Sequence, residues 1–124
     1  MQSVDFVVGD AMMTWQEAED WCLREYGVHL LSIHDAEENA AALTACSSTN
    51  DCWIGAHRSD DAEPQFMWSD GTEADYKRFT AWNETESDCV RLNSNGLWIG
   101  TPCNGSYTPL CAGKGIVSLF GFGS

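Results

Sequence analysis

Six cysteines restrict the fold of this chain more than any other feature of its 124 residues. They are spread at uneven intervals over most of the sequence, at Cys22, Cys46, Cys52, Cys89, Cys103 and Cys111. No two of them form the Cys-x-x-Cys pair expected of a zinc ribbon or a thioredoxin-like centre. An even set of this kind is typical of disulfides in a secreted domain. Six cysteines allow 15 pairings, however, and their spacing alone does not choose between them.

Two N-glycosylation sequons favour the same oxidising compartment. They are Asn83-Glu84-Thr85 and Asn104-Gly105-Ser106. With the cysteines, they predict a secreted or extracellular glycoprotein carrying glycans at Asn83 and Asn104. Residues 1–5 lack the basic start and apolar core of a signal peptide, so we expect a mature form or one domain of a larger protein. No stretch of the sequence is apolar enough to span a membrane.

The net charge narrows the classes of partner. Nineteen acidic residues against six basic ones give a formal charge of −13. Nucleic acids and anionic membrane surfaces are bound through basic patches, so this composition argues against both. A hydrophobic content of 44% in 124 residues is enough for one domain with a buried core.

The first half of the chain predicts a helix with clear ends. Thr14 and Glu17 have the spacing of a capping box, in which each side chain binds a backbone amide of the first turn. Apolar residues then recur at helical spacing over residues 15–26, and Gly27 supplies the left-handed stop.

A second helix and a series of strands follow. Asp35 and Glu38 repeat the capping pattern ahead of a helix over residues 36–46. Short β-type runs separated by Gly, Asp, Asn and Pro then appear at residues 52–58, 65–71, 88–93, 96–100 and 108–113. Because helices come first and strands mostly follow, the predicted class is α+β with antiparallel sheets.

The order of these features resembles the C-type lectin-like domain. The matching segments are TWQEAEDWC with GVHLLSIHDAEEN, then CWIGAHR, FMWSDG, FTAW, DCVRL, NGLWIGTPC and PLC. The resemblance implies a C-type lectin-like fold of two helices packed on antiparallel β-sheets and stapled by disulfides. We expect this domain to occupy residues 1–113, with residues 114–124 as an apolar tail or linker. Five tryptophans lie at positions that form the core or the strands in this family, so we expect them to pack in the core. They are Trp15, Trp21, Trp53, Trp68 and Trp98.

The resemblance also implies a disulfide map. Cys22 would pair with Cys111 and tie the first helix to the last strand, and Cys89 would pair with Cys103 across a hairpin. Cys46 and Cys52 then remain for a short additional bridge.

The family's sugar-binding members hold calcium with a Glu-Pro-Asn-type loop and an Asn-Asp pair after the strand Trp. Here Trp98 is followed by Ile99 and Gly100, neither of which has a side-chain oxygen, and the stretch from Trp82 to Cys89 contains no Glu-Pro-Asn. Calcium needs six to eight oxygen ligands. We therefore expect the main calcium-dependent sugar site to be absent and no cofactor to be required.

An accessory calcium site has weak candidates in Asp60, Asp61 and Glu63, where some family members bind a second ion. A solvated acidic loop is the commoner outcome for such a run.

The three histidines, His29, His34 and His57, lack the spacing of metal ligands. No Ser lies in a nucleophile-elbow motif and no Gly-rich loop matches a phosphate cradle, so we do not expect an enzyme.

A candidate ligand surface lies near the shortened loop. Tyr76 and Trp82 offer aromatic faces, and Lys77 and Arg78 offer an anchor for an acidic group.

The leading hypothesis for the function is a recognition module that binds a glycan or protein without calcium. The alternative is a structural domain that self-associates through the apolar residues 116–122, and an ice- or mineral-binding relative is a third candidate.

Overall fold

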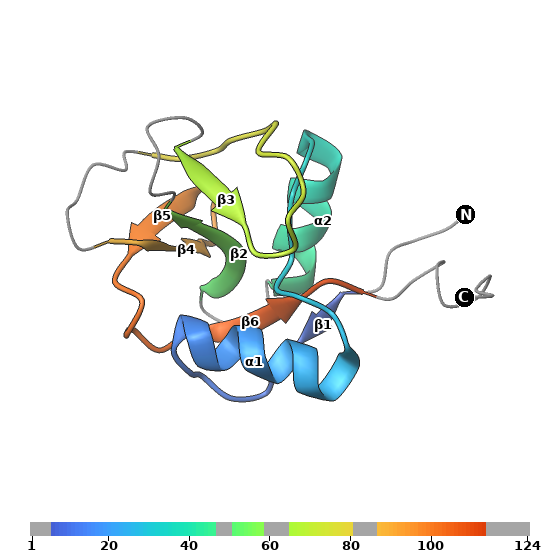
Figure 1. Ribbon diagram of the computed structural model, residues 1–124. Helices are drawn as coiled ribbons and strands as arrows, with labels where there is room; N and C mark the ends of the chain where they lie inside the picture. The colour runs from blue at the N-terminus through green and yellow to red at the C-terminus, as the bar shows by residue number, and fades with distance from the viewer. Residues whose placement is uncertain (1–5, 47–50, 59–64, 81–86, 114–124) are drawn as a thin grey trace.

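The computed structural model describes residues 6–46, 51–58, 65–80 and 87–113. Its elements, in chain order, are β1 (Val7–Val8), α1 (Trp15–Tyr26), α2 (Ala36–Cys46), β2 (Cys52–Arg58), β3 (Phe66–Trp68), β4 (Cys89–Leu92), β5 (Trp98–Thr101) and β6 (Thr108–Cys111) (Figure 1). The two helices lie on different sides of the strands (Figure 1). This architecture confirms the predicted α+β class.

The strands form a sheet in the order β1-β6-β2-β4-β5, with β3 pairing to β2 outside this path. One pairing differs from the antiparallel expectation, because β2 and β6 run parallel, with Cys52 opposite Thr108 and Trp53 opposite Pro109. A tight turn forces its two strands to be antiparallel, but the chain between β2 and β6 contains three further strands. The direction of β6 is therefore not set by a hairpin, and the sheet is mixed.

Helix α1 begins and ends as its sequence predicts. The Thr14 Oγ1 accepts from the Glu17 amide at 3.3 Å, and the Glu17 Oε1 accepts from the Thr14 amide at 3.1 Å. At the other end Gly27 has φ 70°, and its N–H donates to the Leu23 carbonyl at 3.0 Å. A residue with a side chain would be strained in this left-handed conformation.

Helix α2 has the predicted bounds but a modified cap. The Asp35 Oδ1 accepts from the Glu38 amide at 2.8 Å, as expected. The Glu38 carboxylate, however, accepts from the His34 amide at 2.6 Å rather than from that of Asp35. The first turn of α2 therefore fixes the backbone of His34.

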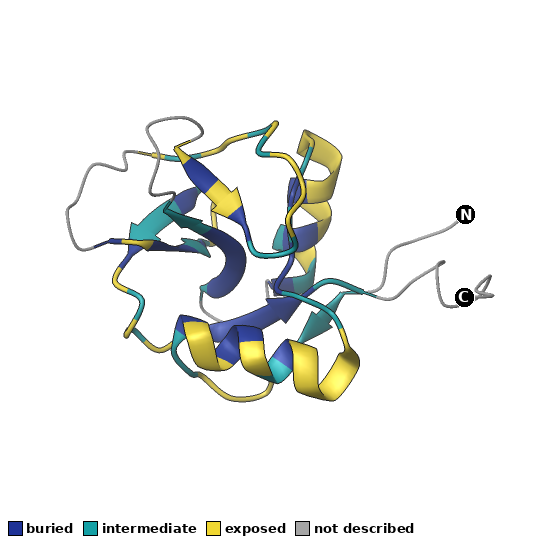
Figure 2. Cartoon of the chain, viewed as in Figure 1, coloured by how far each residue is buried: buried dark blue, intermediate teal, exposed yellow. Residues whose placement is uncertain are grey.

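Three disulfides and a set of buried indoles hold the core together. The disulfides join Cys22 to Cys111, Cys46 to Cys52 and Cys89 to Cys103, which are the pairs that the resemblance implies. The largest fully buried side chains are those of Trp53, Trp68 and Trp98. Buried residues line the inner side of α1 and most of β2 and β6, whereas the outer side of α1 is exposed (Figure 2). Trp15 is also buried, and Trp21 is half-buried against the same core.

Candidate ligand-binding surface

Trp98 lies where the resemblance places the tryptophan of the calcium-site strand, and it belongs to the scaffold. Its indole is fully buried, and its Nε1 donates to the Asn39 Oδ1 at 2.9 Å. Asn39 in turn donates through Nδ2 to the Gly96 carbonyl at 2.9 Å. These two bonds attach α2 to the turn that precedes β5, so Trp98 positions the strand and does not face a ligand.

The two residues after Trp98 do not fit a calcium site. Ile99 and Gly100 are half-buried and contribute no side-chain oxygen. Ile99 pairs with Arg91 on β4, and paired residues of antiparallel strands project from the same face. The Arg91 guanidinium donates to the Asp51 carboxylate at 2.6 Å and to the Thr101 hydroxyl at 2.8 Å. A cation already paired with its carboxylate thus shares the face of Ile99, where a hard cation would need free oxygens.

Residues 76–80 lie directly beside β5. The Arg78 carbonyl accepts from the Trp98 amide at 3.0 Å, and the Thr80 amide donates to the Trp98 carbonyl at 3.3 Å. The Tyr76 ring is half-buried, with its centroid 5.9 Å from that of Trp98 in an edge-on arrangement. Tyr76 is therefore a partial anchor for this segment rather than a fully open aromatic face.

Lys77 and Arg78 project from this anchored segment. Both are exposed, and neither forms an ion pair with any residue that the structure describes. The other lysine and arginine side chains in the described ranges each pair with a carboxylate. These pairs are Arg24 with Glu25, Arg58 with Asp88 and Arg91 with Asp51. In a chain of net charge −13, these two adjacent cations without such a partner make a local concentration of positive charge.

A polar cluster immediately precedes this segment. We call it the His34 cluster, and it consists of Ser32, His34, Asp70, Thr72 and Asp75. The His34 Nδ1 lies 2.7 Å from the Asp75 Oδ1, and its Nε2 lies 3.1 Å from the Ser32 Oγ and 3.0 Å from the Thr72 Oγ1. Asp70 accepts from the Ser32 hydroxyl, the Thr72 hydroxyl and the Thr72 amide, at 2.6, 2.6 and 2.9 Å. The cluster joins the chain ahead of α2 to the loop after β3.

Both carboxylates of the cluster favour the ionised form. Burial alone would raise the pKa of Asp70, but the hydrogen bonds from Ser32 and Thr72 and the charge of His34 lower it below 3.8 overall. The hydrogen bond from His34 lowers the pKa of Asp75. This cluster does not follow from metal-ligand spacing, the pattern against which the sequence of His34 was compared, because the partners of His34 lie up to 41 residues away.

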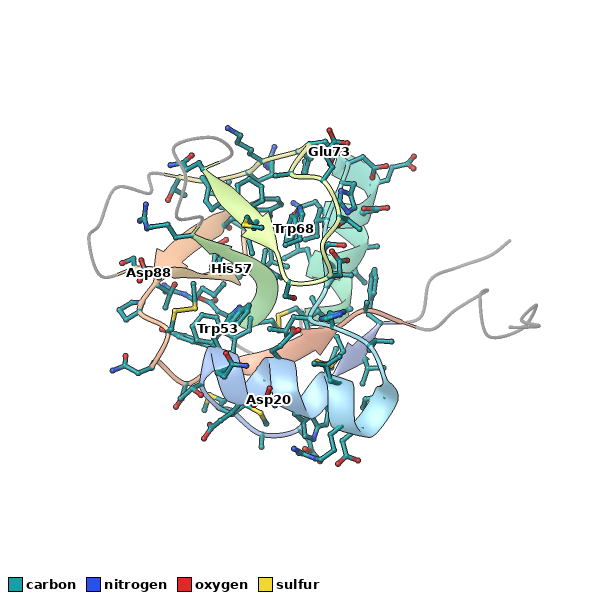
Figure 3. The ribbon with its side chains drawn as sticks, in the orientation of Figure 1. Asp20, Trp53, His57, Trp68, Glu73 and Asp88 are labelled. Carbon is teal, nitrogen blue, oxygen red and sulfur yellow. A yellow bond between two sulfur atoms is a disulfide. The ribbon has the colours of Figure 1, made fainter. Side chains whose placement is uncertain are left out.

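A hollow of about 570 Å³ lies between α1 and the ends of β2 and β4. Figure 3 shows two of its lining residues, His57 and Asp88, on the strand side of α1. Several of its polar groups form hydrogen bonds within the protein. The Glu19 carboxylate accepts from the Leu30 amide and the Ser69 hydroxyl, each at 3.0 Å, and the Arg58 guanidinium donates to Asp88 at 3.1 Å. These contacts give the hollow a structural role.

Several predicted site residues lie outside the described residues, namely Asp60, Asp61, Glu63, Trp82 and Asn83. They stay predictions. Asn104 is exposed in the turn after Cys103, where the Gly105 amide donates to the Pro102 carbonyl at 3.0 Å.

Within the described ranges, no three His, Cys, Asp or Glu side chains come together to hold a metal ion. The helices of the same ranges include none with the length and hydropathy of a membrane span.

Comparison with known proteins identifies the family. The Lectin C-type domain matches residues 11–113, so the chain belongs to this family. Human lymphocyte antigen 75 is 34% identical over 93 residues, which are 74% of this chain and only 5% of that relative. The fold is similar to human lithostathine, with a TM-score of 0.78, 21% identity and coverage of 90% of this chain and 92% of that one. It is also similar to a calcium-independent type II antifreeze protein, with a TM-score of 0.76, 28% identity and coverage of 90% and 86%.

Proposed function

We propose that this domain is an extracellular recognition module that binds an anionic group of a glycan or protein through Lys77 and Arg78, without calcium at the family's usual sugar site. One observation carries the proposal. The two cations are exposed and adjacent, and in the described part of the chain no carboxylate pairs with them. The backbone of Arg78 is held on β5 by the hydrogen bond that its carbonyl accepts from the Trp98 amide.

The chemistry of this pair suits carboxylate, sulfate or phosphate groups. A guanidinium presents a planar fork of donors that matches two oxygens of such a group, and an ammonium adds a point charge. The half-buried Tyr76 ring beside them offers an edge for apolar contact. Trp82, which the sequence analysis also assigns to this surface, lies outside the described residues.

Calcium independence is supported by the composition of β5. Calcium needs six to eight oxygen ligands, and Ile99 and Gly100 provide none from their side chains. The similarity to a calcium-independent type II antifreeze protein provides a precedent within the same fold. The self-associating alternative depends on residues 116–122, which are outside the described ranges.

The test is binding of dextran sulfate to the oxidised protein, with EDTA and with calcium. We expect the same Kd in both buffers and no heat on titration with calcium alone. Lys77→Gln/Arg78→Gln should weaken binding about tenfold, which corresponds to about 1.4 kcal/mol. Arg78→Gln should weaken it more than Arg24→Gln, which removes one exposed positive charge from α1. Equal losses in these two single variants would mean that only net charge matters, and loss of binding in EDTA would contradict calcium independence.

A further inference from the structure

The His34 cluster has a fixed supply of hydrogen-bond donors. The hydroxyls of Ser32 and Thr72 carry one hydrogen each, and an ionised carboxylate only accepts. Both hydroxyls lie 2.6 Å from Asp70, one at each carboxylate oxygen, so both hydrogens point to Asp70. Neither hydroxyl has a hydrogen left for His34.

The imidazole of His34 must therefore donate from both nitrogens. Its Nε2 lies 3.1 Å from the Ser32 Oγ and 3.0 Å from the Thr72 Oγ1. Because the hydrogens of both hydroxyls point to Asp70, these two oxygens can only accept a hydrogen bond from the ring. Its Nδ1 lies 2.7 Å from an oxygen of Asp75, which also accepts. A neutral imidazole has one N–H, so only the doubly protonated form satisfies every contact.

No second cation faces this imidazole in the described part of the chain. From the loop after β3, it meets the carboxylates of Asp70 and Asp75. From α2, the Glu38 carboxylate accepts from the His34 amide at 2.6 Å, and β3 contributes only the Trp68 ring, 6.0 Å away between centroids. The side chain is 26% exposed, so protons exchange with the solvent. Histidine side chains lose their charge between about pH 5 and 8.

Asp75 connects this charge to the ligand surface, because it lies two residues before Lys77. While His34 is protonated, it holds the Asp75 carboxylate. When His34 loses a proton, the positive charge that attracts this carboxylate is lost, and the one remaining N–H can give it only a weaker hydrogen bond. The carboxylate is then held less firmly and can approach the cations of Lys77 and Arg78. A carboxylate at this place competes with an anionic ligand.

We propose that His34 is a pH switch for the ligand surface, in which the protonated ring holds Asp75 firmly and deprotonation weakens this hold, so that Asp75 competes with the ligand for Lys77 and Arg78. This inference rests on the proposed function. The domain then binds anions more tightly in mildly acidic than in alkaline solution. Because exposed ion pairs are weak, the expected change in Kd is about threefold to fivefold.

The experiment measures the Kd of dextran sulfate at pH 6 and pH 8 with EDTA present. For the unaltered protein, we expect weaker binding at pH 8. His34→Gln should show weak binding at both pH values, and Asp75→Asn should show tight binding at both. His57→Gln removes an imidazole elsewhere and should keep the full pH dependence. An unchanged ratio of Kd values in either His34→Gln or Asp75→Asn would overturn the switch.

A second readout separates this proposal from the proposed function. Hydrogen exchange of residues 70–78, corrected for the intrinsic effect of pH, reports the loop without any ligand. Protection should fall at pH 8 in the unaltered protein and be low at both pH values in His34→Gln. If Lys77→Gln/Arg78→Gln binds dextran sulfate normally, the proposed ligand surface is wrong, whereas constant protection between pH 6 and pH 8 contradicts the switch itself.

Discussion

The α1 side of the molecule and the segment of residues 69–80 are held by different kinds of interaction. Helix α1 is joined covalently to β6 through Cys22 and Cys111, and it packs on the fully buried Trp53. Residues 69–80 contain no helix or strand beyond a single bridge at Phe79, and they contain no cysteine. Ring contacts of Tyr76 and Phe79 with Trp98 anchor them to the core, and the rest of their attachment is polar, through the His34 cluster, Ser69 and two hydrogen bonds to Trp98. Disulfides and apolar contacts carry no ionisable group, whereas hydrogen bonds to histidine and carboxylate side chains depend on pH. In the switch that we propose, the scaffold therefore stays constant while the proposed ligand surface responds to pH.

The largest expected effect comes from removing the covalent link on the α1 side. Cys22→Ala/Cys111→Ala opens a loop with a sequence separation of 89 residues, which should lower the free energy of unfolding by about 4–5 kcal/mol in the loop-entropy account. Denaturant unfolding measures the loss. Cys46→Ala/Cys52→Ala, with a separation of 6, should cost only about 2 kcal/mol. Equal losses in the two double variants would show that loop length does not govern the stability of this side.

A smaller effect is expected where the two regions meet, at Glu19. This buried carboxylate on α1 accepts from the Leu30 amide and from the Ser69 hydroxyl, at the start of the 69–80 segment. Both of these bonds end on Oε1, and Oε2 lies 2.5 Å from the His29 Nδ1. Glu19→Gln removes the charge of this buried group and replaces Oε2 with an N–H donor, so it should lower the free energy of unfolding by about 1–3 kcal/mol. Chemical denaturation at neutral pH tests this. Glu25→Gln, which breaks an exposed pair with Arg24, is the control and should change stability by less than about 0.5 kcal/mol.

The smallest expected effect is the pH-dependent contribution of Asp70, within residues 69–80, to the free energy of unfolding. The pKa of Asp70 is lowered on folding, so its ionised form adds stability above the ordinary value of 3.8 and loses it as the pH falls through the lower folded value. Asp70→Asn should cost up to about 1 kcal/mol at pH 7, a modest value because solvent screens a partly exposed group. The difference from the unaltered protein should shrink below about pH 4 in melting curves.

Thr72→Val provides the check on this last prediction. It removes one of the hydroxyl donors to Asp70 and should reproduce part of the loss at neutral pH. A difference between Asp70→Asn and the unaltered protein that grows in acid would mean that burial, and not hydrogen bonding, dominates at Asp70.

Sequence reasoning worked where partners are close along the chain or where the family pattern supplies the pairing. Thr14 and Glu17 are three residues apart, so their reciprocal cap can be read directly, and the resemblance provides the disulfide pairs. The parallel pairing of β2 with β6 joins residues far apart in the chain, and no local pattern encodes its direction. The contacts of His34 were missed for the same reason, since its partner Asp75 lies 41 positions later. Acidic residues are too common in this chain for any one of them to indicate a partner.

The disulfide between Cys22 and Cys111 also decides how the domain would carry mechanical load. If both ends were pulled, β1 would peel from β6, where Val7 pairs with Cys111, and the strain would then run along the chain to Cys22. There the sulfur–sulfur bond would pass the force straight to Cys111. Everything between these two cysteines, including Lys77 and Arg78, lies within a covalent loop that bears no tension. We therefore expect the ligand surface to keep its shape when the chain is stretched.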